Sequence, residues 1–143
     1  MSPGAIRGSL PSPSKGGLLR RWVPVAIYVV LILTVSSIPH LRTPGFEDSD
    51  KVAHFCEYGL LGLLARRAAN RPGVRGWILA LAIASAIGAC DELYQRLVPG
   101  RFSSAFDWMA DSLGAASGAA AWSVLSGAWA ARRARSVRQG EGS

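Results

Sequence analysis

Two stretches of this chain, residues 22–38 and 112–131, contain no charged residue. Each approaches the roughly 20 apolar residues that an α-helix needs to cross the hydrocarbon of a bilayer. Only 17% of the 143 residues are charged, whereas about a quarter is usual in a soluble domain. These features predict a membrane protein.

Two further apolar segments complete the expected architecture. Residues 77–90 are free of charge, and the segment is long enough to span if the two acids that follow it face protein. The segment 52–69 carries several ionisable residues, so it inserts only if its polar face packs against the other helices. We therefore expect an all-α membrane protein with four transmembrane helices, at about 22–38, 51–69, 75–97 and 104–131.

The distribution of basic residues predicts the orientation. Arginines gather before the first segment, between the second and third, and after the fourth. The positive-inside rule then places both termini in the cytoplasm. We expect a disordered cytoplasmic N-terminus over 1–17, a four-helix membrane domain over 18–131, and a basic cytoplasmic tail over 132–143 that is disordered or lies on the lipid surface.

The basic and apolar residues also allow two other interpretations, a cleavable signal peptide and a nucleic-acid-binding protein. A cleavable signal peptide would explain Arg20-Arg21 before an apolar core, but the core is long, lacks an A-x-A-like site, and ends near Pro39. The net charge of +7 invites a nucleic-acid interpretation, yet no nucleic-acid-binding module is recognisable. We expect the lipid bilayer, and no nucleic acid, as a partner.

Three short polar clusters abut the apolar segments. They are Asp50-Lys51-x-x-His54-x-x-Glu57-Tyr58, Asp91-Glu92-x-x-Gln95 and Arg101-x-x-Ser104-x-x-Asp107-x-x-x-Asp111. Ionisable side chains at membrane depth cost a few kcal/mol each, so such residues indicate a functional site by default. The predicted topology puts all three clusters on the extracytoplasmic side.

The residue types suggest acid/base chemistry on an anionic substrate. We take Glu92, Asp91 and His54 as candidate general acids or bases. Candidate substrate-binding residues are Lys51, Tyr58, Gln95, Arg101, Asp107 and Asp111. The acids together with His54 could hold a hard divalent ion, but their spacing matches no standard metal motif, so we assign no metal ligand, and the cofactor is unknown.

A structural interpretation competes with the functional one. Ser104-x-x-Asp107 has the form of a helix capping box. Arg101 with Asp107, and Lys51 with an acid of the second cluster, could form a lattice of buried ion pairs. Small residues favour close helix packing in membranes, and this role is expected for Gly59, Gly62, Gly114, Ser117 and Gly118.

The chain resembles the VanZ-like family of small bacterial membrane proteins. The resemblance rests on Ser36-Ser37-x-Pro39, Asp50-Lys51-x-x-His54-Phe55-x-x-Tyr58 and Asp91-Glu92-x-x-Gln95-x-x-Val98-Pro99-Gly100-Arg101-x-x-x-x-x-Asp107-x-x-x-Asp111-x-x-Gly114. It covers roughly residues 22–120, and it implies a compact four-helix protein of the bacterial cell membrane, with several passes. The family pattern often has Asn at the position of Asp111. The founding member reduces susceptibility to teicoplanin-type glycopeptides, without an agreed reaction.

Three functions follow as hypotheses. The protein could be an enzyme that acts at the outer leaflet on a lipid-linked or cell-envelope substrate. It could instead bind a cell-wall precursor, a lipid headgroup or a glycopeptide without chemistry. In the third hypothesis it is a structural subunit of a larger membrane complex, held through the Ala/Gly-rich face of its fourth helix. We expect an envelope function, with glycopeptide resistance as the form that the resemblance implies.

Overall fold

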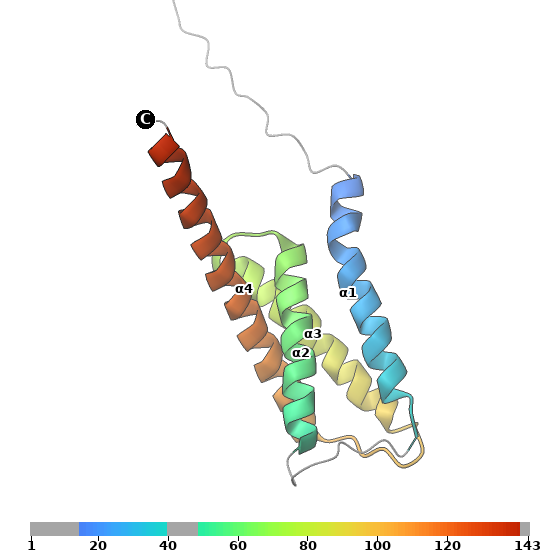
Figure 1. Cartoon of the computed structure of the whole chain (residues 1–143). Helices are drawn as coiled ribbons and strands as arrows, with labels where there is room; N and C mark the ends of the chain where they lie inside the picture. Colours follow the sequence, from blue (N-terminus) through green and yellow to red (C-terminus); the bar gives the residue numbers. More distant parts are fainter. Residues whose placement is uncertain (1–14, 40–48, 141–143) are drawn as a thin grey trace, which may run out of the picture.

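The described part of the computed structural model, residues 15–39 and 49–140, consists of four α-helices. They are α1 (Lys15–Ser36), α2 (Ser49–Ala69), α3 (Gly73–Gln95) and α4 (Ala105–Gly140). Successive helices run in opposite directions (Figure 1). The end of α1, the start of α2, the end of α3 and the start of α4 therefore lie at one end of the molecule. The all-α prediction is confirmed.

Helix α2 lies at the centre of the fold. It contacts α1, α3 and α4, and Figure 1 shows α1 and α4 on its opposite sides. Sequence analysis singled out this helix as the one that needs a protein environment for its polar residues. The fold provides that environment, because the most polar helix contacts all three of the others.

Glycines allow α2 and α4 to approach each other closely. A Cβ atom on Gly62 would collide with the backbone of Ala115, one on Gly114 with the carbonyl oxygen of Phe55, and one on Gly118 with that of Gly59. Close backbone approach through small residues is a common way to associate helices in lipid, where apolar side chains gain little by leaving the solvent. The expected packing role is confirmed for these glycines, whereas Ser117 is exposed and bonds to the Leu113 carbonyl within its own helix.

The buried core is built mainly from small residues. Six alanines of the described residues are fully or almost fully buried, and they lie on α2, α3 and α4: Ala65, Ala68, Ala80, Ala84, Ala115 and Ala119. Large apolar side chains instead cover the outside, for example Ile27 on α1, Ile78 on α3 and Val124 on α4. An outer surface of this kind suits lipid.

Two of the described helices are long and apolar enough to cross a membrane, namely Gly16–Ser36 and Gly73–Gln95. Helix α2 carries too many ionisable residues along its length for the same criterion. The long helix α4 has a mostly uncharged middle and a strongly basic end. The helices thus bear out membrane character, and the crossing of all four stays a prediction.

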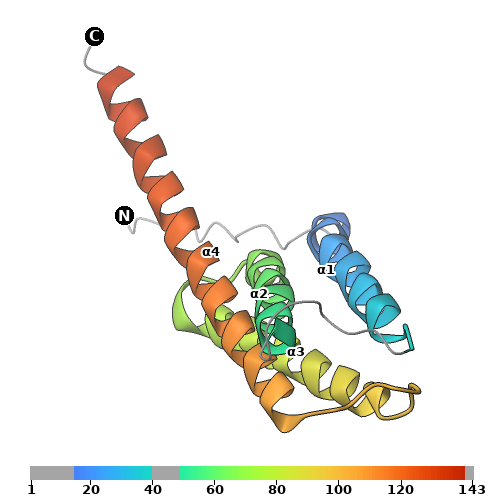
Figure 2. The same cartoon turned by 60° about the horizontal axis from the view of Figure 1, so that its bottom comes forward.

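Two helix bounds differ from the expected ones by more than two residues. Helix α1 begins at Lys15, within the segment 1–17 that was expected to be disordered, and residues 1–14 lie outside the described part. Helix α4 continues to Gly140 instead of ending near Ala131. Residues 132–139 include neither Gly nor Pro, and four of the eight are Arg, a strong helix former, so the helix extends at little cost. Figure 2 shows this end projecting well beyond the other helices.

The close α2–α4 packing generates a stability prediction. Gly118→Ala places a methyl group against the Gly59 carbonyl, and overpacking of this kind costs about 1–3 kcal/mol. Gly127→Ala, on the same helix, meets nothing within 4 Å and should hold or slightly raise stability through helix propensity. Thermal unfolding in detergent checks both variants. Equal melting temperatures for the two would contradict a tight α2–α4 contact.

Candidate functional site

Polar side chains from all four helices gather at the end of the molecule where α2 and α4 begin. Ser36 ends α1, His54 lies in the second turn of α2, Glu92 is in the last turn of α3, and Asp107 is in the first turn of α4. The alternating direction of the helices brings these positions together. Residues of motifs that are far apart in the sequence thus lie at the same end of the bundle.

His54 is the centre of the larger group. Its Nδ1 atom lies 2.9 Å from Oδ1 of Asp111 on α4 and 4.0 Å from Oε1 of Glu92 on α3. Asp111 is completely buried, and the His54 side chain is only 13% exposed. The histidine therefore joins three helices through two carboxylates.

Glu92 holds the start of α4 in place. Its Oε2 atom accepts a hydrogen bond of 2.8 Å from the backbone N–H of Ser104, while the Ser104 hydroxyl accepts one from the N–H of Phe106. Ser104 thus caps α4 as predicted. Its own N–H, which the capping box would pair with Asp107, is instead bonded to Glu92. Asp107 remains available to face His54.

Asp91 belongs to a second group, between α1 and α3. Its Oδ2 atom accepts hydrogen bonds from the Ser36 hydroxyl at 2.9 Å and from Nε2 of Gln95 at 3.2 Å. The Asp91, Gln95 and Ser36 side chains are all almost fully buried. The sequence predicted that Asp91, Glu92 and His54 belong to one site. The structure instead places Asp91 in one hydrogen-bonded group and Glu92 with His54 in another.

Tyr58 and Asp111 pack together over a glycine of α3. A Cβ atom on Gly88 would lie 2.9 Å from Oδ2 of Asp111 and 3.3 Å from Cε1 of Tyr58. Within the described residues, neither this carboxylate oxygen nor the buried Tyr58 hydroxyl has a hydrogen-bond partner. Leaving such groups unpaired costs about 1–3 kcal/mol each, which is a reason to look for a ligand here.

The two predicted cationic residues lie at the same end. Lys51 is in the first turn of α2, and Arg101 is in the segment between α3 and α4. Both side chains are half-buried. Their assignment to anion binding stays a prediction.

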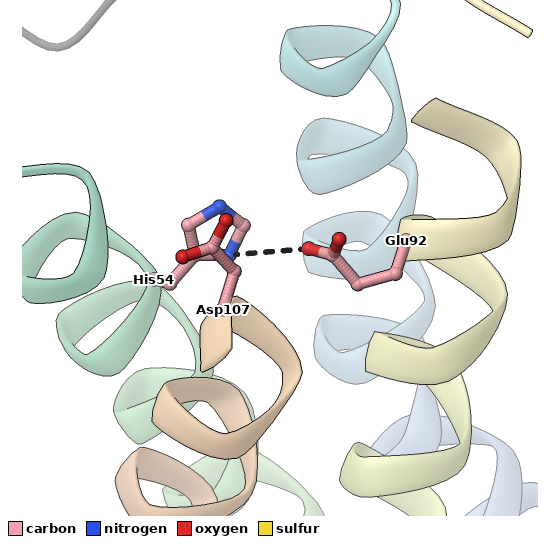
Figure 3. Close-up of side chains that lie close together, drawn as sticks. All are labelled: His54, Glu92 and Asp107. Atoms are coloured by element: carbon pink, nitrogen blue, oxygen red, sulfur yellow. Dashed lines mark ion pairs between the residues drawn. The ribbon is translucent and has the colours of Figure 1, made fainter. Parts of the chain in front are cut away.

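Three ligand-type side chains come close enough to share an ion. One ligand atom each of His54, Glu92 and Asp107 lies within 4.8 Å of the others, and Figure 3 shows them converging from three helices. A groove of about 310 Å³ is lined by Glu92, Ser104 and Trp108 among others, but not by His54 or Asp107. The cluster thus borders, through Glu92, a space that a ligand could enter.

Sequence analysis missed some of the parts that hold this site. Ser36 was noticed only in a motif, although its hydroxyl bonds to Asp91. Gly88 was not singled out, although it makes room for Asp111. Gly88 lies one turn before Asp91-Glu92 on a largely apolar helix. This position was the sequence signal for a close contact there.

The contact between His54 and Asp111 generates a prediction that separates hydrogen bonding from charge. Asp111→Asn keeps an oxygen that can accept from His54, so the melting temperature should change little. Asp111→Ala removes the acceptor from a buried site and should cost about 1–3 kcal/mol. Thermal unfolding and imidazole nitrogen chemical shifts check this. If the Asn variant is as unstable as the Ala variant, the negative charge rather than the hydrogen bond is what the fold requires.

The comparisons with known proteins agree with the fold and the motifs. No curated protein and no solved structure gives a significant match. The family model VanZ/LLP1 matches residues 16–126, a range that contains α1, α2, α3, the start of α4 and every site residue described above. The chain therefore belongs to the VanZ/LLP1 family and is a VanZ-like membrane protein.

Proposed function

We propose that this protein spans the bacterial cell membrane four times, with both termini in the cytoplasm and the His54 group at the outer face. The basic residues support this orientation. Arg66 and Arg67 are at the end of α2, and the arginines of α4 are at its C-terminal end. The C-terminal ends of α2 and α4 lie at the end of the molecule opposite to the start of α2 and the end of α3 (Figure 1), which carry His54 and Glu92. Positive residues are retained on the cytoplasmic side of membranes.

At the outer face, the protein acts on a lipid-linked substrate of the cell envelope. The observation that carries this proposal is the buried arrangement of His54 between Asp111 and Glu92. Polar groups of this kind are costly at membrane depth and usually mark a substrate or ion pathway. The adjacent groove gives a headgroup access to Glu92.

The geometry supports acid/base chemistry. Glu92 and His54 lie close enough to exchange a proton through one water or a substrate hydroxyl, and Asp111 orients the imidazole. Lys51 and Arg101 would hold the negative charge of the substrate. We do not assign Asp91 to the acid/base chemistry, because its hydrogen bonds to Ser36 and Gln95 favour a structural role.

Two alternative functions have less support from the structure. A purely binding protein would use the same cationic residues without proton transfer, and reduced teicoplanin susceptibility would follow from either mode. A structural subunit would use the small residues of α4. Gly114 and Gly118 of that helix are covered by α2, whereas Gly127 meets nothing within 4 Å, so a partner would have to bind the C-terminal half of α4.

A pair of neighbouring substitutions tests the proposal. Glu92→Gln should abolish the envelope phenotype, measured as teicoplanin susceptibility of cells that express the protein, while protein abundance and melting temperature hold. If the protein is an enzyme, turnover falls about 100- to 10,000-fold. Asp91→Asn keeps an oxygen that can accept the Ser36 and Gln95 bonds, so it should change the melting temperature little and keep the activity. An active Glu92→Gln variant would remove the proposed chemistry.

The orientation has its own test. A reporter that is active only outside the cytoplasm should work when fused after Gly100, next to the start of α4. The same reporter fused after Asn70, between α2 and α3, should be silent. The reverse result would place the His54 group in the cytoplasm, and an outer-face function would then be abandoned.

A further inference from the structure

We infer that His54, Glu92 and Asp107 bind one divalent transition-metal ion, of the zinc or manganese class, at the mouth of the helix bundle. Binding of the ion stands on the structure alone, while its use on a substrate rests on the function proposed above. The sequence spacing had indicated no metal ligand. The inference comes from the three-dimensional arrangement.

The first argument is geometric. The three ligand atoms lie within 4.8 Å of one another, so an ion placed centrally would be within about 2.8 Å of each. Zinc binds His nitrogen and carboxylate oxygen at about 2.0–2.2 Å, so small side-chain rotations close the site. The three ligands come from α2, α3 and α4 (Figure 3), so the bound ion would connect three helices.

One carboxylate oxygen of Glu92 is buried without a hydrogen-bond partner among the described residues. Glu92 is 5% exposed, and its Oε1 atom has no hydrogen-bond partner in the described ranges, although it faces His54 Nδ1 at 4.0 Å. Its other oxygen is already bonded to the Ser104 N–H. A buried carboxylate oxygen in this position is expensive. A metal ion held between this oxygen and the Nε2 atom of His54 would satisfy it.

Asp111 lies where it can orient the His54 imidazole toward an ion. Asp111 accepts a hydrogen bond from Nδ1 of His54, which leaves the lone pair on Nε2. A carboxylate that orients a ligating histidine is the usual outer partner in zinc sites. The residue is fully buried, so its orientation is fixed by packing.

The chemistry of the ligand set indicates the class of ion. One imidazole and two carboxylates suit zinc or manganese better than calcium or magnesium, which prefer oxygen ligands alone. Three protein ligands also leave a coordination position open, as in catalytic zinc sites. The groove beside Glu92 would let a water molecule or a phosphate oxygen reach that position.

Metal analysis of the purified, full-length protein tests the inference. The protein is prepared in detergent with a tag that contains no histidine, stripped with a chelator, and titrated with Zn²⁺ or Mn²⁺. We expect one ion per chain by elemental analysis and a higher melting temperature with the ion. Glu92→Gln and Asp107→Asn should lose binding, and Asp111→Asn should weaken it about 10- to 100-fold.

Asp91→Asn is the matched control, because it removes a buried acid one residue from Glu92 that belongs to the other polar group. This variant should bind the ion as the wild type does. The inference fails if folded wild-type protein binds no ion, or if Glu92→Gln binds it equally well. Equal loss in Asp91→Asn would also overturn it, since binding would then depend on the fold rather than on these ligands.

The metal inference and the proposed function can fail separately. A protein that binds no ion but loses its envelope phenotype on Glu92→Gln would refute the metal site alone. A protein that binds the ion but leaves glycopeptide susceptibility and envelope lipids unchanged would refute the proposed function alone.

Discussion

The close contact between α2 and α4 is the constraint on which the rest of the structure depends. Glycines on both helices let the two backbones touch, and this sets the distance between side chains on the facing surfaces. Phe55 follows His54 in the sequence, and Gly114 lies one helix turn after Asp111. The backbones of Phe55 and Gly114 are in close contact, which lets His54 Nδ1 and Asp111 Oδ1 approach to 2.9 Å. Packing at the small residues therefore determines the geometry of the polar group.

The same packing explains how a helix as polar as α2 can sit in the middle of a membrane protein. Apolar residues on α1 and α3 face outward, and the polar face of α2 is covered by its neighbours. Charge is unfavourable against lipid but acceptable against partners of suitable chemistry. Hydrogen bonds across the bundle, such as those of Glu92 to the start of α4 and of Asp91 to the end of α1, offset part of the burial cost.

Much of the fold was accessible from the sequence, because charge-free runs and arginine positions are strong signals. The helices themselves and the meeting of the three polar motifs at one end followed from those signals. The extent of α4 did not, since the charge of the segment after Ala131 suggests disorder, whereas its helix-forming composition lets the helix continue to Gly140. The division of the site did not follow either. Spacing along a helix shows which residues share a face, but not which neighbouring helix that face meets.

Asp91 and Glu92 show the consequence most clearly. Adjacent residues on an α-helix point about 100° apart, so two acids that look equivalent in the sequence can meet different neighbours. Here Asp91 turns to Ser36 on α1, and Glu92 turns to His54 on α2 and Ser104 before α4. One oxygen of Asp91 has two hydrogen-bond donors, and its other oxygen is buried without a partner among the described residues. The unpaired oxygen of Glu92 is instead directed at an imidazole. Two adjacent residues thus belong to different polar groups, and Glu92 is the one whose group includes a histidine that could share a ligand.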